Sequence, residues 1–229
     1  VLKAILDVLP DQPSVDRVVL DFEKAMWAAV RSVLPGVTLM GCAFHWTQAL
    51  WRKVQELGLA MAYCHDDGLH RFIRKLMALP FLPAIQIPTV FQRLRLQATT
   101  PALVNLVDYV ATNWIHSPTF PPTDWSVYGQ SIRTNNDIEG WHNGLNRCAS
   151  GRVHLPFYLL VKLLHSEAKL TEIQVRLVSE QKLKRIQRKK YRQLQAKIFA
   201  LWEQYQSHSK SAMQLLKSCS YLNGPVRVQ

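Results

Sequence analysis

Two short β-rich runs, each followed at once by a helical pattern, constrain the fold of this chain most strongly. The runs cover residues 17–20 and 37–42, and the helical patterns cover residues 22–34 and 45–57. Pro35-Gly36 ends the first helical pattern, because proline and glycine stop helices. A strand–helix–strand–helix order favours a parallel α/β piece.

Most of the rest is predicted to be helical. Residues 64–125 read as an all-helical stretch that ends in a proline-rich loop from His116 to Asp124. A further helix is expected from Thr134 to Cys148. A long helical pattern runs from Pro156 to Tyr205, and we expect at least one break in it because an unbroken helix would be roughly 75 Å long.

Composition places the chain among globular proteins. Its 229 residues, 48% of them hydrophobic, suffice for a sizeable core, and no apolar run reaches the roughly 18 residues of a membrane span.

The four cysteines are scattered without a CxxC pair, which favours a reducing, intracellular compartment. The N-terminus lacks a signal-peptide layout and an initiator Met and opens within a helical pattern, so we expect a chain cut from a longer protein.

A net charge of +12 makes a polyanion, such as nucleic acid, a plausible partner. The excess is concentrated in residues 182–192, which hold seven bases and no acid. At helical spacing these bases could form one stripe for DNA phosphates, although a solvated helix face or a nuclear import signal would have the same composition. The seven are Lys182, Lys184, Arg185, Arg188, Lys189, Lys190 and Arg192.

Asp21 comes directly after the first β-rich run. The carboxyl ends of parallel strands are where α/β sheets place ligand-binding groups, and a carboxylate there suits Mg²⁺, which prefers oxygen ligands. The alternative is an aspartate that caps the following helix.

Glu139 is expected on a polar helix face. With it lie Asn135, Asn136, His142, Asn143 and Asn146. Gly140 and Gly144 each cost the helix roughly 1 kcal/mol relative to alanine, so they suggest close approach of another backbone or of DNA. The alternative is a polar surface helix with packing glycines.

Cys42 and His45 form a CxxH at the turn from the second strand into its helix. Zinc needs three or four such ligands, and the other cysteines and histidines form no second paired spacing, so structural zinc is not favoured. The pair is then either a buried cysteine with a capping histidine or a part of an active site.

The order of these motifs resembles that of Mutator-like element DNA transposases over about residues 1–170. The resemblance rests on Leu20-Asp21-Phe22-Glu23-x-Ala25, Cys42-x-x-His45 and Asn135-Asn136-x-x-Glu139. Further matches, typical of the version found in animal genomes, are Phe44-His45-x-x-Gln48, Trp114-Ile115, Arg133-Thr134-Asn135-Asn136 and Glu139-Gly140-Trp141-His142-Asn143.

The resemblance implies an RNase H-like catalytic domain with an aspartate, aspartate, glutamate triad for cut-and-paste transposition. Asp21 matches the second aspartate and Glu139 the glutamate, and together with the first aspartate they would hold two Mg²⁺ (or Mn²⁺) ions. The first aspartate belongs on a strand upstream of residue 1, since Asp7, Asp11 and Asp16 lie too close to Asp21. We therefore expect this chain alone to be inactive, and the longer parent protein to be an enzyme.

The fold class implied is α/β and predominantly helical, a partial RNase H-like fold with two short parallel strands. Residues that would support the active site near DNA are Cys42, His45, Asn135, Asn136, His142 and Asn143. The expected domains are 1–63, the second half of the catalytic core; 64–125, the all-α insertion; 126–150, the glutamate helix; and 151–229, a C-terminal helical region with the basic stretch.

The expected partners are the transposon ends and target DNA in the nucleus, with no membrane and with a homo-oligomer left open. Two alternatives stand beside this interpretation. One is a domesticated relative that binds DNA as a regulator without cutting it. The other is a helical interaction protein in which the motif matches arise by chance.

Overall fold

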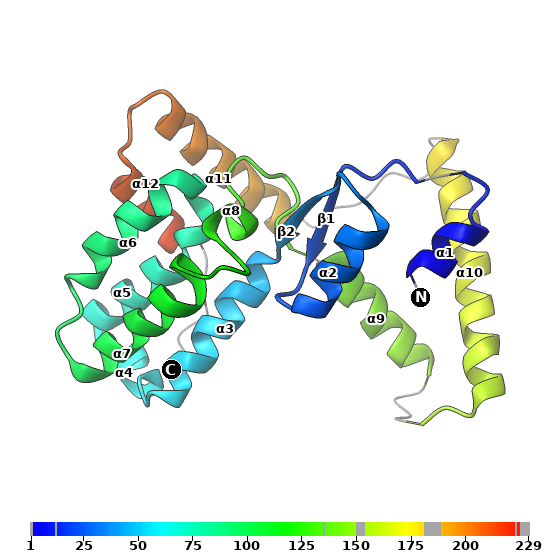
Figure 1. Cartoon of the computed structure of the whole chain (residues 1–229), viewed down its shortest axis with the longest axis horizontal. Coiled ribbons are helices and arrows are strands. Elements are labelled where there is room, and N and C mark those ends of the chain that lie inside the picture. The colour runs from blue at the N-terminus through cyan, green and yellow to red at the C-terminus, as the bar shows by residue number, and fades with distance from the viewer. Residues whose placement is uncertain are drawn as a thin grey trace. The chain divides into compact units, whose positions relative to one another are not determined.

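A computed structural model of the chain describes residues 2–11, 13–134, 136–149, 154–180, 189–222 and 224. Within these ranges the protein is mostly helical, with a single sheet of two short strands (Figure 1). The chain forms two compact units. The first unit comprises Val1–Thr134 and Leu194–Gln229, and the second comprises Asn135–Gln193.

The predicted strand–helix–strand–helix order is confirmed. Strand β1 (Arg17–Leu20) pairs in parallel with β2 (Thr38–Gly41), and α2 (Lys24–Val33) connects them while α3 (Ala43–Glu56) follows β2. Leu20 lies opposite Gly41 in the register, so both strands end at the same edge of the sheet. Gly36 has a φ of 91°, a conformation that glycine adopts without the strain of a side chain, and it turns the chain from α2 toward β2.

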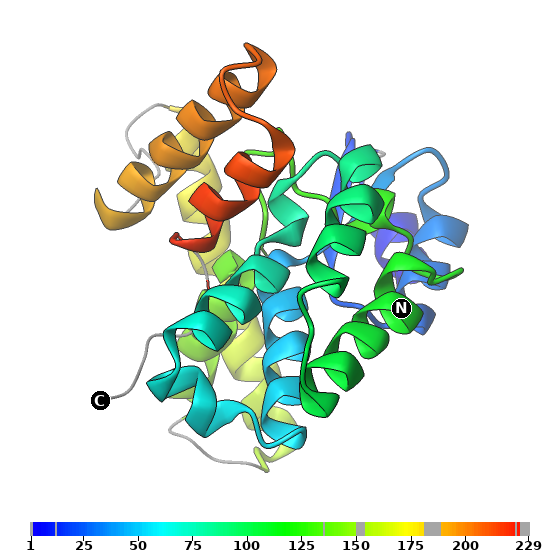
Figure 2. The ribbon, with the colours of Figure 1, turned by 90° about the vertical axis from the view of Figure 1, so that its left-hand side faces the viewer.

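The first unit contains further helices besides α2 and α3. Helix α3 packs against α5 and α7, and α12 packs against α5 (Figure 2). Their bounds are α1 (Leu2–Val8), α4 (Ala60–His65), α5 (Asp67–Met77), η1 (Leu79–Phe81), η2 (Ala84–Gln86), α6 (Ile87–Arg95), α7 (Pro101–Val110), the π-helix η3 (Ala111–Ile115), α8 (Pro122–Trp125) and α12 (Ala212–Ser220).

Local capping explains where two of these helices begin. The Asp66 carboxylate accepts hydrogen bonds from the backbone N–H groups of Gly68 and Leu69, so it caps α5. Thr100 caps α7 in the same way through the N–H of Leu103, and Pro101 occupies the first turn.

The second unit holds α9 (Asn136–Cys148), α10 (Phe157–Ser179) and the start of α11 (Lys189–Gln206), most of which belongs to the first unit. The long helical pattern predicted from Pro156 to Tyr205 corresponds to α10 and α11, and residues 181–188 between them lie outside the described ranges. Helix α10 buries none of its side chains. No described helix has both the length and the apolar character needed to cross a membrane.

Candidate active-site edge

Asp21 is the first residue after β1, at the edge of the sheet where both parallel strands end. Its carboxylate is half exposed, with a side-chain accessibility of 50%. The position follows from the local sequence, because the apolar run of β1 ends at Leu20 and α2 begins only at Lys24. The short connecting segment therefore presents a solvated carboxylate at the edge where α/β folds bind their ligands.

His45 meets this carboxylate from the first turn of α3. Its Nδ1 lies 2.8 Å from Oδ1 of Asp21. The distance is that of a hydrogen bond, but the two groups are not aligned as one, so the contact is best described as a close electrostatic pair. The structure thus brings together two predicted site residues from different strand–helix turns.

Cys42 lies at the same edge but inside the core. It is fully buried at the N-terminal end of α3, and its backbone N–H donates to the carbonyl of Leu20 over 2.8 Å. All four cysteines are free. Within the described ranges, no cluster of three or more His, Cys, Asp or Glu side chains could hold a metal ion.

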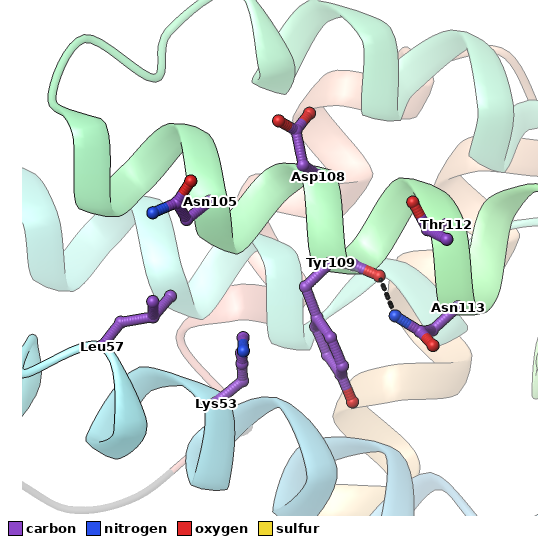
Figure 3. A pocket seen from close by; sticks show the side chains of 7 residues that line it. All are labelled: Lys53, Leu57, Asn105, Asp108, Tyr109, Thr112 and Asn113. Carbon is purple, nitrogen blue, oxygen red and sulfur yellow. Dashed lines mark hydrogen bonds between the residues drawn. The ribbon is translucent and has the colours of Figure 1, made fainter.

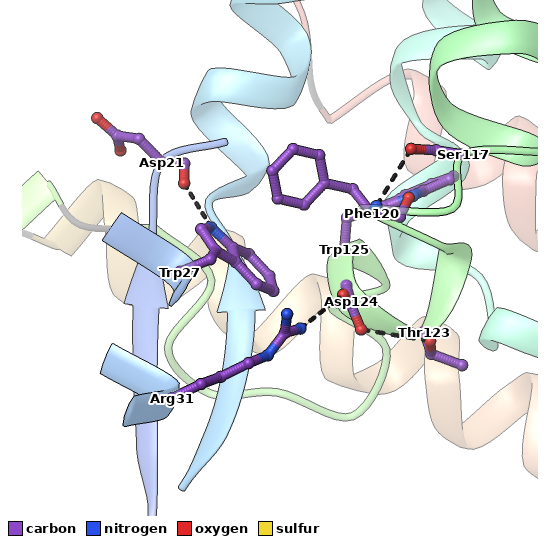
Figure 4. A network of polar contacts seen from close by, with 8 residues as sticks. All are labelled: Asp21, Trp27, Arg31, Ser117, Phe120, Thr123, Asp124 and Trp125. Atoms are coloured by element: carbon purple, nitrogen blue, oxygen red, sulfur yellow. Dashed lines mark hydrogen bonds and ion pairs between the residues drawn. The ribbon is translucent and has the colours of Figure 1, made fainter. Parts of the chain in front are cut away.

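The segment that carries Asp21 is packed into a cluster of buried aromatic rings. The indole Nε1 of Trp27 donates a hydrogen bond of 2.7 Å to the main-chain carbonyl of Asp21 (Figure 4). Phe22, the next residue, packs edge-to-face against Trp114 and Phe120, with ring centroids 4.6 and 5.4 Å away. Trp114 and Phe120 belong to residues 64–125, the stretch predicted to be helical, so this part of the chain packs directly on the Asp21 segment. We call these six rings the aromatic cluster: Phe22, Trp27, Trp46, Trp114, Phe120 and Trp125.

Gly41 at the end of β2 makes room for this arrangement. A Cβ at residue 41 would lie 2.3 Å from Cε1 and 2.4 Å from Cζ of Phe22. Such contacts are far below van der Waals separation, and the Phe22 ring is itself held by Trp114 and Phe120. A side chain at position 41 would therefore displace the residue next to Asp21.

An ion pair lies on the far side of Trp27. Nη2 of Arg31 is 3.5 Å from Oδ2 of Asp124, and the guanidinium lies 5.4 Å from the Trp27 ring (Figure 4). Burial raises the pKa of Asp124 above its usual value, against the smaller lowering effect of Arg31 and of the Thr123 hydroxyl. Desolvation therefore changes the pKa of Asp124 more than the 3.5 Å ion pair with Arg31 does. No sequence pattern indicates this pair, since its members are far apart in the chain.

Arg133 ties the segment before α9 to the same edge of the sheet. Its carbonyl accepts a hydrogen bond of 2.9 Å from the backbone N–H of Ala43, at the start of α3. Its guanidinium donates to the Gln195 side chain over 2.5 Å, and burial lowers its pKa. Gln195 in turn donates to the carbonyl of Ser131. The last residues of the first unit before α9 are thus fixed beside α3 and α11.

Glu139, His142 and Asn143 lie on α9, in the second unit, and all three are exposed. Neither Gly140 nor Gly144 would place a Cβ within 4 Å of another group, so the close approach expected from these glycines is not made within the described part of the chain. Asn136 begins α9 but its side chain lies outside the described set, and Asn135 lies outside the described residues.

A shallow pocket in the second unit adjoins this helix. It has a volume of about 450 Å³ and lies between α9 and α10. The indole of Trp141 donates to the carboxylate of Glu167 over 3.3 Å at its side. The lining residues are Trp141, Gly144, Leu145, Arg147, Cys148 and Glu167.

The basic stretch falls largely outside the described residues. Lys182, Lys184, Arg185 and Arg188 lie outside them, and Lys189 and Lys190 begin α11 without a description of their side chains. Arg192 is exposed on α11. By sequence, residues 135–193 hold twelve bases and five acids, so they carry +7 of the net charge of +12.

A second groove, on the helical part of the first unit, contains none of the predicted site residues. It has a volume of about 430 Å³ and lies between α3 and the α7–η3 helix (Figure 3). Its charges are paired, since Lys53 lies 2.8 Å from Glu56, and Asp108 lies 2.7 Å from Arg95. The lining residues are Lys53, Leu57, Asn105, Asp108, Tyr109, Thr112 and Asn113.

The grouping of Asp21 with His45 and Cys42 is the main chemical feature of the first unit. Comparisons of the chain with protein families, with curated proteins and with solved structures find no match. The function therefore has to be inferred from the residues of the chain and their geometry.

Proposed function

We propose that this chain is part of a Mutator-like DNA transposase of the DDE type, in which Asp21 and Glu139 are catalytic carboxylates. The observation that carries the proposal is the contact between Asp21 and His45. These residues belong to two separate sequence motifs, and they lie 2.8 Å apart at the end of a parallel strand pair. Parallel pairing brings the two strand ends to one edge, and the residues that meet there, an aspartate and a histidine, are the two that the proposal requires at this edge.

In this proposal β1 and β2 are the last two strands of an RNase H-like sheet, and the helices that follow form the insertion before the glutamate helix. Support comes from the parallel pairing, from the α2 connection, and from the position of Asp21 at the carboxyl end of β1. The insertion would also have a structural role, because Trp114 and Phe120 pack on Phe22.

Chain connectivity supports a role for Glu139 together with Asp21. Arg133 is bonded to the start of α3, where His45 lies, and Glu139 follows Arg133 by only six positions. Even fully extended, six residues span at most about 20 Å. This bound on the distance between Arg133 and Glu139 is compatible with the proposal that Glu139 acts together with Asp21.

Asp21 fits a hard divalent cation in its chemistry, since it offers half-exposed carboxylate oxygens at a ligand-binding edge. One carboxylate does not make a site, so the proposal requires Glu139 and a further aspartate from a neighbouring strand. Mg²⁺ or Mn²⁺ ions, when bound, would polarise the scissile phosphate and activate the attacking hydroxyl. His45, whose Nδ1 lies 2.8 Å from Oδ1 of Asp21, would orient the Asp21 carboxylate.

DNA is the substrate and partner that this proposal requires, and the nucleus is the compartment in which it would act. The positive charge of residues 135–193 supports this, because phosphate contacts supply most of the sequence-independent affinity for DNA. In this arrangement the unit with α9 would also contain most of the DNA-binding charge.

The test uses protein produced from the whole reading frame that contains this chain. We expect Mg²⁺-dependent nicking of the ends of its own element, abolished in both Asp21→Asn and Glu139→Gln while salt-sensitive DNA binding remains. Cys148→Ser, an exposed change on α9, is the matched control and should nick normally. DNA binding without nicking in the unaltered protein would instead indicate a regulator that no longer transposes, and absence of both would contradict any role with DNA.

A further inference from the structure

We infer that Trp27 is a positioning residue for Asp21, acting through its indole N–H on the main-chain carbonyl of Asp21. The inference rests on the proposed function of Asp21 as a metal ligand and assigns the means by which that ligand is held. Neither the motifs nor the resemblance points to Trp27.

The geometry of the bond carries the inference. The Trp27 side chain is 1% exposed, and its Nε1 lies 2.7 Å from the Asp21 carbonyl oxygen. Asp21 therefore has its main chain fixed from the core side and its carboxylate directed to the exposed edge. Rotation about the Asp21 backbone would leave the indole N–H of the buried Trp27 without its acceptor, which is costly for a buried donor.

Phe22 fixes the other end of the same peptide unit. Its ring lies against Gly41 and between Trp114 and Phe120. Two consecutive residues are thus held by buried groups, one through its carbonyl and the other through its ring. A carboxylate on such a segment is preorganised, which is what a metal ligand needs in order to bind without a large ordering cost.

The aromatic cluster also offers a matched control. Trp46 is equally buried, at 1% exposed, and it also donates its indole N–H to a main-chain carbonyl, that of Met77, over 3.2 Å. Its partner lies on α5, away from Asp21. Replacing either tryptophan with phenylalanine removes one N–H and part of one ring from the same cluster, but only Trp27→Phe releases the Asp21 carbonyl.

The experiment measures binding of Mn²⁺ alone, by water-proton relaxation, to protein produced from the whole reading frame that contains this chain, together with thermal unfolding. We expect Asp21→Asn to abolish the Asp21-dependent binding. Trp27→Phe should weaken that binding about fivefold, the equivalent of one ordinary hydrogen bond, whereas Trp46→Phe should leave it unchanged at a similar loss of stability. A purely structural role for Trp27 would make the two tryptophan variants alike.

The outcomes separate this inference from the proposed function. Loss of binding in Asp21→Asn with unchanged affinity in Trp27→Phe overturns the positioning role alone. Unchanged binding in Asp21→Asn overturns the metal-ligand proposal, and the positioning role with it. If Trp27→Phe does not fold, a benzothiophene analogue of tryptophan at position 27, which keeps both rings but lacks the N–H, tests the same bond, and normal Mn²⁺ affinity in that variant would overturn the inference.

Discussion

At the scale of single residues, the Asp21 edge depends on contacts that sequence patterns do not contain. Periodicity places Asp21 after a strand and His45 on the next helix, and the structure puts them 2.8 Å apart. The sequence could not reveal that Trp27 donates to the carbonyl of Asp21, because this bond depends on side-chain packing in the folded core. The aromatic cluster is not predictable for the same reason, since its members are scattered from Phe22 to Trp125.

Gly41→Ala is expected to destabilise the protein by about 1–3 kcal/mol, as overpacking in a filled core does. The new methyl group would lie 2.3 Å from the Phe22 ring, which Trp114 and Phe120 prevent from moving aside. Chemical denaturation measures the change. Gly140→Ala is the control, because its Cβ meets nothing within 4 Å and alanine favours a helix, so that variant should be no less stable than the parent. Equal stability of Gly41→Ala and the parent would contradict the close packing of Phe22.

The stability contributed by Asp124 is expected to fall as pH rises. Burial raises its pKa in the folded state above the ordinary value of 3.8, so the folded protein holds the proton more tightly than the unfolded chain. Stability should therefore decline as pH rises from the ordinary pKa through the raised one, and then level off. Asp124→Asn should remove this dependence and be no less stable than the parent at neutral pH, because Arg31 is 56% exposed and remains solvated. Unfolding experiments across that pH window test it, and a parent whose stability rises with pH there relative to the Asn variant would refute it.

At the scale of elements, the sequence predicts the pieces whose patterns are strong. Both strands, α2 and α3 follow from apolar runs, helical periodicity and the helix stop at Pro35-Gly36, and the helical character predicted for residues 64–125 is found as well. Helix α12 lies within the C-terminal helical region expected over residues 151–229, but it is not predicted as a separate element, because its sequence is short and weakly periodic. A signal for it is nevertheless present, since Ser211 and Gln214 form a capping box just before the apolar pair Leu215 and Leu216.

Ser211→Ala should cost about 1 kcal/mol of stability, the usual effect of losing an N-cap side chain. Ser211 accepts a hydrogen bond from the backbone N–H of Gln214, and the Gln214 side chain accepts one from the N–H of Ser211. The loss should lower the stability of the first unit as a whole, because α12 buries Leu215 and Leu216 and packs against α5. Ser14→Ala, at an exposed position in the loop before β1, is the matched control. Equal stabilities of the two variants in thermal unfolding would rule out a contribution from the capping box.

At the scale of the whole molecule, the net positive charge and the buried hydrophobic residues are distributed unequally between the two units. The first unit holds all of the buried hydrophobic residues described, whereas residues 135–193 hold most of the net positive charge. A unit with little core and a high charge is a poor candidate for a stable scaffold and a good one for a surface that binds a polyanion. The sequence already locates the excess of positive charge in residues 182–192, but it does not reveal the bounds of the second unit or its scarcity of buried residues, because these depend on tertiary packing.

The salt dependence of DNA binding should reflect this division. Changing Lys189, Lys190 and Arg192 to glutamine should reduce the slope of log affinity against log salt by up to about 0.9 for each phosphate that is no longer neutralised. Arg52, Arg71 and Arg93, exposed on the first unit, provide a control with the same charge change. Fluorescence anisotropy with random-sequence duplex DNA measures both, and identical slopes for the two triple variants would show that binding follows net charge alone.

The contact between Gly41 and the ring of Phe22 has a consequence for how this sequence can diverge. Position 41 can gain a side chain only if position 22 gives up an aromatic ring, since the two would otherwise occupy the same space. A substitution at either position alone gives a protein of lower stability, because it leaves either a clash or a cavity. Homologues should therefore show correlated substitution at these two sites, with glycine retained wherever a ring follows the aspartate.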